Sequence, residues 1–261
     1  MNPYLSVIIP AYNEESRLGQ TLSAIYAYLC AQDFTWEVIV VLDGSQDNTL
    51  AVLHAFVAGE GRPHEGQFRW IPREENRGKG FTVREGMLAA HGDIRLFTDA
   101  DNSTDINHFD KMRPLFAAGA DIVICSRDRK DADDAQQAVP QNPVKRFLGN
   151  TANLLIQVVA VPGIWDTQCG FKAFTAPAAA HIFSLAQIDR WGFDIEALAL
   201  GRRFGYEIGV VGAYWVNREG THVRPVDYFK TLGDTFRTRW NLMTGVYDHA
   251  PRPVPDETPQ V

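Results

Sequence analysis

The chain has 261 residues, of which 45% are hydrophobic and 22% are charged. This composition is typical of a globular enzyme with a substantial core, and it excludes disorder over most of the chain. Lys and Arg total 25 while Asp and Glu total 32, so the net charge is −7. An acidic chain does not act as a polycation for DNA or RNA, so we expect no nucleic-acid partner and expect any anionic ligand to be held locally.

The chain carries no obvious targeting or membrane segment. The longest apolar stretches, 5–9 and 154–162, are far shorter than the roughly 20 residues that cross a bilayer, so we expect no transmembrane helix. The N-terminus lacks a basic or cleavable apolar leader, which argues against secretion. Cys30, Cys125 and Cys169 lack metal-ligand spacing, so we expect neither a disulfide framework nor a zinc site. These observations predict a cytoplasmic protein.

Short apolar runs alternate with segments of helical periodicity over the first half of the chain. Strands are predicted at 5–9, 36–42, 68–71, 94–98 and 121–125, and helices at 15–31, 47–58, 78–90 and 106–117. This alternation predicts an α/β domain with a single Rossmann-like, mostly parallel sheet flanked by helices. Ligands of such sheets bind at the carboxyl ends of the strands, so the residues that follow each strand are the functional candidates.

The second half of the chain changes character near residue 128. Residues 128–143 are polar, acidic and interrupted by proline, which predicts a mobile loop or lid. The pattern then predicts a helix at 144–160, a glycine-rich motif at 166–174, a helix at 193–204 and short strands at 206–216. We expect a catalytic domain over 1–220, a C-terminal helical segment over 221–249 and a disordered, proline-rich tail over 250–261.

The last predicted helix, at 226–242, is amphipathic. Its apolar side consists of Phe229, Leu232, Phe236, Trp240 and Met243. We interpret this stripe as the face by which the helix packs on the catalytic domain. The neighbouring Lys230, Arg237 and Arg239 leave a membrane-surface helix as the alternative.

The first two predicted strands end in polar side chains that suit a nucleoside. Pro10 is expected to end the first strand because it lacks an amide proton, and Asn13 is expected to cap the following helix. A tyrosine face, here Tyr12, is suited to stacking on a base, and a carboxylate such as Glu14 is suited to accepting from its imide N–H. Asp43, at the tip of the second strand, is a candidate acceptor for a ribose hydroxyl or the base. Asp47 and Thr49 are interpreted as capping residues.

The third and fourth strand ends point to phosphate and metal chemistry. Gly78 and Lys79 lie where a glycine-rich turn opens a helix, an arrangement that favours an anionic phosphate. Asp99 and Asp101 lie two residues apart after an extended run, so their carboxylates are expected to converge on one hard cation, Mg²⁺ or Mn²⁺. The alternative is that the two aspartates are structural and cap the start of a helix.

Other enzyme classes fit the strand ends less well. The first strand is not followed by a dinucleotide-binding glycine fingerprint, and the sequence holds no Walker A motif. A phosphohydrolase of the haloacid-dehalogenase type, with Asp99 as nucleophile, remains an alternative, but it gives the first three strand ends no task. A catalytically silent protein that binds nucleotide sugars is a further alternative.

Four of these motifs together resemble a known family. The strings LSVIIPAYNEE, VVLDGSQDNT, ENRGKG and FTDADNS resemble, in order and spacing, the nucleotide-binding half of family 2 glycosyltransferases of the GT-A fold. The segments at 125–127, 166–172 and 190–196 look like the branch that contains dolichyl-phosphate β-glucosyltransferase and bacterial polyprenyl-phosphate hexose synthases. The resemblance covers about residues 5–220. Relatives in this branch commonly carry transmembrane segments, which this sequence is not expected to have.

The resemblance implies a role for each matching position. Pro10, Tyr12, Glu14 and Asp43 would hold the nucleoside, Gly78 and Lys79 would lie near the nucleotide, and Asp99, Ala100 and Asp101 would serve sugar, diphosphate and metal. Arg127 would face an acceptor phosphate, with Arg146 a weaker candidate. Asp166 would lie near the transferred sugar with Gln168 beside it. Asp194 and Glu196 would be alternatives for sugar binding or base catalysis.

The implied reaction is metal-dependent, inverting transfer of a hexose from a nucleotide sugar. By resemblance the donor is UDP-glucose and the acceptor a polyprenyl phosphate; a soluble phosphorylated metabolite or a glycan is the alternative acceptor. A phosphate acceptor is already anionic and needs only a cation such as Arg127, whereas a hydroxyl acceptor requires a base, for which Asp166 is the first choice. A lipid acceptor would be reached at the cytoplasmic membrane face through the 147–161 helix or the C-terminal helix.

Overall fold

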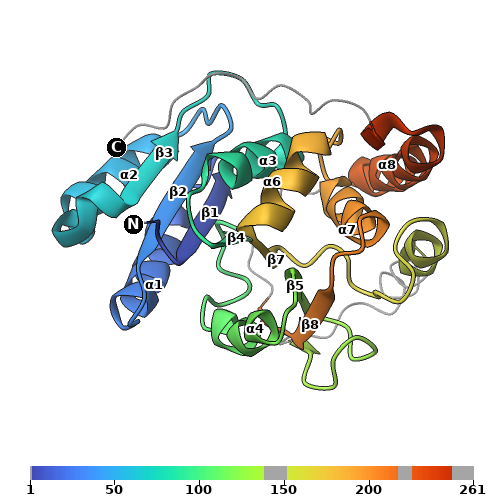
Figure 1. The fold of residues 1–261 in the computed structure, drawn as a ribbon. Helices are drawn as coiled ribbons and strands as arrows, with labels where there is room; N and C mark the ends of the chain where they lie inside the picture. The colour runs from blue at the N-terminus through green and yellow to red at the C-terminus, as the bar shows by residue number, and fades with distance from the viewer. Residues whose placement is uncertain (1, 138–151, 217–224, 249–261) are drawn as a thin grey trace.

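The computed structural model describes residues 2–137, 152–216 and 225–248. Within these ranges a seven-stranded sheet of order β3-β2-β1-β4-β7-β5-β8 carries helices on both faces (Figure 1). Its strands are β1 (Leu5–Ala11), β2 (Trp36–Leu42), β3 (Phe68–Ile71), β4 (Ile94–Thr98), β5 (Ile122–Ser126), β7 (Phe171–Thr175) and β8 (Ile208–Gly212). A two-stranded sheet pairs β6 (Gln136–Gln137) with β9 (Tyr214–Trp215). The prediction of a mixed, mostly parallel sheet is confirmed.

The helices divide between the two faces of the large sheet. They are α1 (Leu18–Cys30), α2 (Thr49–Ala58), α3 (Lys79–Ala89), α4 (His108–Ala117), α6 (Ala176–Leu185), α7 (Phe193–Arg203) and α8 (Pro225–Thr244), with short 3-10 helices η1 (Arg62–Gln67) and η2 (Val246–Asp248). Val7 and Ile9 of β1 belong to the core shared with α1, α2 and α4. Ile8 belongs to the opposite core, shared with α3, α6 and α7. Alternate residues of a strand thus reach opposite layers.

Two predictions about the first loop are wrong. Pro10 does not end β1, because the strand continues to Ala11 and pairs with Leu42 of β2. The pairing of β1 with β4 stops at Ile8. Proline, which has no amide proton, is therefore tolerated at position 10, because no hydrogen bond to β4 is required there. Asn13 does not cap α1; it adopts φ +55° and its Oδ1 accepts a 2.8 Å hydrogen bond from the backbone N–H of Gln46.

Strand β7, like helix α6 and strand β6, was not predicted from the periodicity. It runs antiparallel between β4 and β5, whereas the other neighbouring strands of the large sheet are parallel. Because its direction is reversed, the residues that precede it, 166–170, lie at the edge where the parallel strands end. This reversal brings the start of the segment 166–172 (DTQCGFK) to the edge of the sheet where ligands are expected.

The acidic loop after β5 is anchored where the structure describes it, at 128–137. Asp131 accepts hydrogen bonds from the backbone N–H groups of Trp165 and Asp166, both at 2.8 Å, and from the hydroxyl of Ser126 at 2.7 Å. This part of the predicted lid is therefore tied to the body of the domain. The remainder of the loop, Arg146 and the predicted tail at 250–261 lie outside the described residues, and the helix predicted at 144–160 is described as helical at 152–159.

Helix α8 packs through a polar face and exposes its apolar one. Its buried side chains are Asp227, Thr231, Thr235, Thr238 and Asn241. The predicted packing stripe points outward instead, with Phe229 76%, Phe236 53%, Trp240 66% and Met243 68% exposed. The prediction that this stripe packs on the domain is therefore wrong, although the helix itself does contact α7. Over the described ranges, no helix combines the length and apolar character that a membrane span requires.

Candidate active site

The loops that follow β1 and β2 interlock at the ligand edge of the sheet. The backbone N–H of Glu14 donates to the hydroxyl of Thr49 at 2.7 Å, and that of Glu15 donates to Asp47 at 3.1 Å. Asp47 also accepts the Thr49 N–H at 3.0 Å, but it lies one residue before the N-cap of α2, which is Asn48 and makes no side-chain cap hydrogen bond. These bonds fix the backbone that carries Tyr12 and Glu14.

The carboxyl group of Glu14 is buried beside the predicted metal ligands. Burial raises its pKa to about 7, against the opposing effect of Arg17, whose Nε donates to Glu14 Oε2 at 2.7 Å. The negative charges of Asp101 and Asp99 add to the rise. Glu14, which follows β1, is therefore near enough to the two aspartates that follow β4 to sense their charges.

Asp43 fixes the glycine-rich turn before α3. Its two carboxylate oxygens accept hydrogen bonds from the backbone N–H groups of Arg77, at 2.8 Å, and Gly78, at 2.9 Å. Gly78 has φ +105°, and a Cβ there would collide with the backbone carbonyl of Asp189, so the turn requires glycine. Asp43 therefore positions the turn whose helix α3 begins at Lys79.

Lys79 links the turn to the fourth strand end. Its Nζ lies 2.5 Å from Oδ1 of Asp99, and 5.6 Å from the centre of the Trp191 ring. Burial disfavours the charged ammonium, but the negative charges of Asp99, Asp194 and Asp101 outweigh it and raise the pKa of Lys79. Lys79 is a fixed positive charge at the place where the sequence predicts phosphate.

The aspartate pair after β4 has the donor set of a shared metal site. Oδ1 of Asp101 accepts the backbone N–H of Ser103 at 2.9 Å, and a Cβ at Gly170 would overlap the carboxylate of Asp99. Among the described residues, no group of three or more His, Cys, Asp or Glu side chains is arranged to hold a metal. The two carboxylates have the oxygen donors that Mg²⁺ or Mn²⁺ prefers, and any further ligands would have to come from outside this pair.

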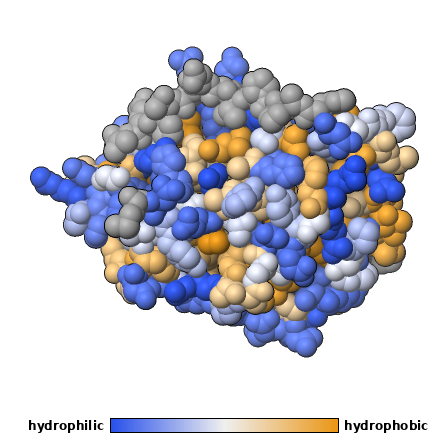
Figure 2. All heavy atoms as spheres, viewed as in Figure 1, coloured by the Kyte–Doolittle hydropathy of each residue, from blue (hydrophilic) through white to orange (hydrophobic). Residues whose placement is uncertain are grey.

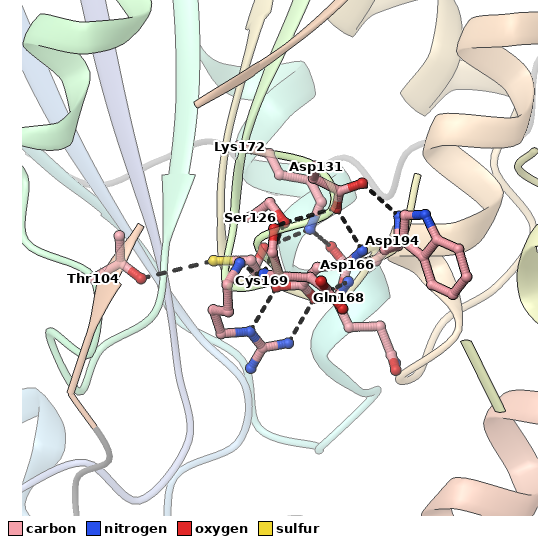
Figure 3. A network of polar contacts seen from close by, with 11 residues as sticks. Thr104, Ser126, Asp131, Asp166, Gln168, Cys169, Lys172 and Asp194 are labelled. Carbon is pink, nitrogen blue, oxygen red and sulfur yellow. Dashed lines mark hydrogen bonds and ion pairs between the residues drawn. The ribbon is translucent and has the colours of Figure 1, made fainter. Parts of the chain in front are cut away.

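Arg127 and Asp166, the latter labelled in Figure 3, form a bidentate ion pair. Nε and Nη2 of Arg127 donate to the two oxygens of Asp166 at 2.7 and 2.8 Å, and the Arg127 backbone N–H donates to the same carboxylate at 2.8 Å. Burial opposes ionisation of Asp166, but the charge and hydrogen bonds of Arg127 outweigh it and lower the pKa of Asp166. The carboxylate most favoured as a base is thus a weak proton acceptor in this arrangement.

Asp131 and Lys172 are two polar groups of this region that the sequence analysis missed. Asp131 holds the backbone of Asp166 from the acidic loop. Lys172 is fully buried in β7, and its Nζ donates to Oδ1 of Asp194 and to the carbonyl of Cys169, each at 2.5 Å (Figure 3). A buried lysine in an alternating strand pattern gives no local signal, because its partner lies 22 residues further on.

The other predicted residues take different places. Asp194 lies in the cluster with Lys79 and Asp99, and burial raises its pKa against the opposing charges of Lys172 and Lys79. The backbone N–H of Gln168 donates to Asp166 at 3.3 Å. Glu196 is fully buried, and its oxygens accept the backbone N–H groups of 187 and 188 and the hydroxyl of Tyr247. Glu196 braces the loop before α7 and is not exposed to a sugar.

Comparison with known proteins supports one family. Residues 6–183 match the model of glycosyl transferase family 2. The chain is 37% identical over 247 residues to the dolichyl-phosphate beta-glucosyltransferase of Drosophila melanogaster, covering 90% of this chain and 74% of that protein. It is 31% identical over 254 residues to the Dictyostelium discoideum protein of the same name, covering 94% and 77%. Its fold resembles that of glucosyl-3-phosphoglycerate synthase from Mycobacterium tuberculosis, solved in complex with Mn²⁺, UDP and phosphoglyceric acid. The TM-score is 0.61 at 20% sequence identity, and the match covers 99% of this chain and 86% of that one.

Proposed function

Because the chain belongs to glycosyltransferase family 2, we propose that it transfers glucose from UDP-glucose to the phosphate of a polyprenyl phosphate of the dolichyl type. The family makes it a hexosyltransferase and leaves the phosphohydrolase alternative without support. The two relatives described above match most of this chain, and both are dolichyl-phosphate beta-glucosyltransferases. Their name supports glucose as the transferred sugar and a dolichyl-type phosphate as the acceptor.

The Arg127–Asp166 pair is the observation that carries this choice of acceptor. A hydroxyl acceptor must lose a proton to a nearby base, whereas a phosphate oxygen attacks as the anion it already is. Asp166 is occupied by Arg127 and its pKa is lowered, so it is poorly suited to take that proton. The guanidinium of Arg127 stays charged. Burial works to lower its pKa, but the negative charge of Asp166 outweighs burial and raises it. This fixed cation suits an acceptor phosphate.

In the proposed reaction the residues around Asp99 hold the leaving group. Asp99 and Asp101 would hold Mg²⁺ or Mn²⁺, which when bound neutralises the charge that develops on the departing diphosphate. Lys79 adds a second positive charge at the same place. Tyr12 and Glu14 would contact the nucleoside, and Pro10, Asp43 and Gly78 would shape the backbone around it. The acceptor phosphate, held by Arg127, attacks the anomeric carbon from the opposite side and inverts its configuration.

A screen of donors and acceptors by mass spectrometry tests the proposal. The full chain is incubated with Mn²⁺ and UDP-glucose, UDP-galactose or GDP-mannose, and with polyprenyl phosphate or 3-phosphoglycerate as acceptor. We expect a polyprenyl-phosphate hexose with UDP-glucose. Transfer to 3-phosphoglycerate alone would replace the lipid acceptor with a soluble one. Release of free hexose or phosphate without transfer to either acceptor would contradict the proposal.

A further inference from the structure

The apolar stripe of α8 faces away from the protein. Phe229, Phe236, Trp240 and Met243 lie seven, four and three residues apart, a spacing that aligns them along one side of a helix. The face that α8 buries is the opposite one, built largely from threonines, with Thr235 and Thr238 fully buried. Helices of globular proteins normally bury the apolar face and expose the polar one. Helix α8 does the reverse, and four large apolar side chains are left at the surface.

Hydrophobic surface is visible on this side of the molecule. Figure 2 shows hydrophobic atoms at the right-hand edge of the view, where α8 and the helical residues 152–159 lie in Figure 1. Two side chains of that second helix, Leu154 and Val158, are also largely exposed. The exposed apolar surface is thus a property of this side of the domain and not of one isolated side chain.

Basic residues border the stripe of α8 on both sides. Helical periodicity places Lys230 and Arg237 along one border and Arg239 along the other. The acidic residue Asp227 is buried beneath the helix and lies 3.5 Å from Lys230 Nζ, so it balances part of the charge on that border, whereas Arg239 lies on the other one. The chain as a whole has a net charge of −7, which makes this positively bordered face a local exception.

A groove lies along one border of the stripe. It has a volume of about 550 Å³ and lies between α8 and the loop before α7, with Lys230, Asp234 and Arg237 on one wall and Asp189 and Arg190 on the other. The second wall contacts α3, because the carbonyl of Asp189 accepts the backbone N–H of Phe81 at 3.0 Å. This wall of the groove is therefore packed against the start of α3 and the glycine-rich turn before it.

We propose that α8 docks the protein on an anionic phospholipid bilayer. Phe229, Phe236, Trp240 and Met243 enter the boundary between headgroups and acyl chains, while the flanking Lys and Arg side chains contact lipid phosphates. An amphipathic helix with aromatic residues on one face and cations along its borders has the chemistry of an interfacial helix. The groove then opens at the headgroup level, where a lipid-linked phosphate enters it. The role of the groove builds on the proposed acceptor, whereas docking itself does not.

A second copy of the chain is a poorer occupant of the same face. Two stripes packed against each other would bring the borders that carry Lys230, Arg237 and Arg239 together, and like charges would repel. A bilayer rich in anionic lipid supplies the opposite charge along both borders and an apolar layer between them. The charge arrangement therefore favours the lipid surface.

Co-sedimentation with lipid vesicles tests docking without donor or acceptor. The full chain is mixed with vesicles of phosphatidylcholine and phosphatidylglycerol, or of phosphatidylcholine alone. We expect binding to the anionic vesicles and a fall of about tenfold or more in the partition coefficient for Phe229→Ser/Trp240→Ser. Leu50→Ser, which removes a partly exposed leucine from α2, is the matched control and is expected to bind as the wild type does. Arg239→Gln is expected to weaken binding to anionic vesicles only.

Several results would overturn docking. The wild-type chain could fail to bind anionic vesicles, or could bind neutral vesicles equally well. The double variant could also bind anionic vesicles as tightly as the wild type does. A wild-type dimer in sedimentation velocity that the double variant converts to monomer would assign the stripe to a second copy. Thermal unfolding of each variant checks that the fold is kept. Docking without transfer to polyprenyl phosphate would leave this inference standing and remove the proposed function.

Discussion

The guanidinium of Arg127 and the carboxylate of Asp166 face each other edge to edge, with two hydrogen bonds of 2.7 and 2.8 Å between them. Arg127 follows β5 and Asp166 precedes the antiparallel β7, so the pair joins two strand ends that are 39 residues apart in the chain. Asp131 holds the backbone of Asp166 from a third segment. The cation proposed for the acceptor is therefore held by three parts of the fold.

Replacing Arg127 by lysine tests its proposed contact with the acceptor. Lysine keeps the positive charge but loses the planar fork that binds Asp166 on one side and a phosphate on the other. We expect the KM for the acceptor to rise about tenfold or more, because a charged hydrogen bond contributes roughly 1.5–3 kcal/mol. The KM for the nucleotide sugar should change little in steady-state kinetics. A larger change in the donor KM would assign Arg127 to the donor site.

Replacing Asp166 by asparagine separates an orienting role from a basic one. Because the pKa of Asp166 is lowered, it is ionised throughout the neutral range and adds no acidic limb to the pH–rate profile. We expect Asp166→Asn to raise the acceptor KM as the Arg127 variant does and to leave the shape of that profile unchanged. A loss in kcat of about 10²–10⁴ together with loss of an acidic limb would identify Asp166 as the general base.

Replacing Asp101 by alanine tests the metal site. We expect transfer to be abolished and Mn²⁺-dependent binding of UDP to be lost in calorimetry, with thermal unfolding close to that of the wild type, because Asp101 is only partly buried. Asp93→Asn is the control, since Asp93 is an exposed acid just before β4, at the end of the strand opposite Asp99. Unchanged turnover of Asp101→Ala would remove the metal from the account.

The buried pair of Lys172 and Asp194 makes a prediction about stability. Lys172→Met leaves the Asp194 carboxylate buried without its closest cation, and we expect the free energy of unfolding to fall by about 3–5 kcal/mol. The double variant Lys172→Met/Asp194→Asn should lose less than the sum of the single variants, because neither member of the pair is left charged and unpaired. Urea unfolding of all four proteins measures this. Additive losses would show that the two side chains are not coupled.

Glu14 predicts a pH dependence of stability. Its pKa is about 7 in the folded chain, chiefly because of burial, and 4.5 is the ordinary value that applies when the chain is unfolded. The folded state binds the proton more tightly, so the contribution of Glu14 is fully present below pH 4.5 and is lost as the pH rises to about 7. We expect Glu14→Gln to flatten this fall, which amounts to about 3 kcal/mol at most. Urea unfolding between about pH 4.5 and 8 measures the slope.

The exposed acid Glu65 supplies the control for that series. Glu65→Gln should keep the slope of the wild-type chain, because its carboxyl group lies at the surface. Parallel curves for Glu14→Gln and the wild type over the same pH range would contradict the assignment of the slope to Glu14.

The parallel half of the sheet was predictable from sequence because its signals are local. The runs at 36–42, 68–71 and 94–98 match β2, β3 and β4, since strands buried on both faces consist almost entirely of apolar residues. Strand β7 escaped prediction because Lys172 interrupts its apolar pattern, and its charge is neutralised by Asp194 from a distant helix. Nothing in the sequence around Lys172 reveals that partner.

The candidate site was predictable as a set of positions but not as a set of contacts. The residues that follow parallel strands gather at one edge for topological reasons, so Glu14, Asp43 and Asp99 were identifiable from the strand ends. Which of them pair with each other depends on loop conformation. Asp43 accepts from the glycine turn and Asp131 supports Asp166, and both contacts span more than 30 residues of chain. The outward orientation of the α8 stripe likewise depends on tertiary packing, which helical periodicity does not encode.

The most direct test of the central claim compares two acceptors that differ only in the phosphate. The full chain is given UDP-glucose, Mn²⁺ and either polyprenyl phosphate or the polyprenol of the same chain length, and product formation is followed by mass spectrometry. An acceptor that attacks as an anion beside Arg127 predicts glucosylation of the phosphate and none of the alcohol. Glucosylation of the alcohol at a comparable rate would mean that a base operates in the site, and it would contradict the account.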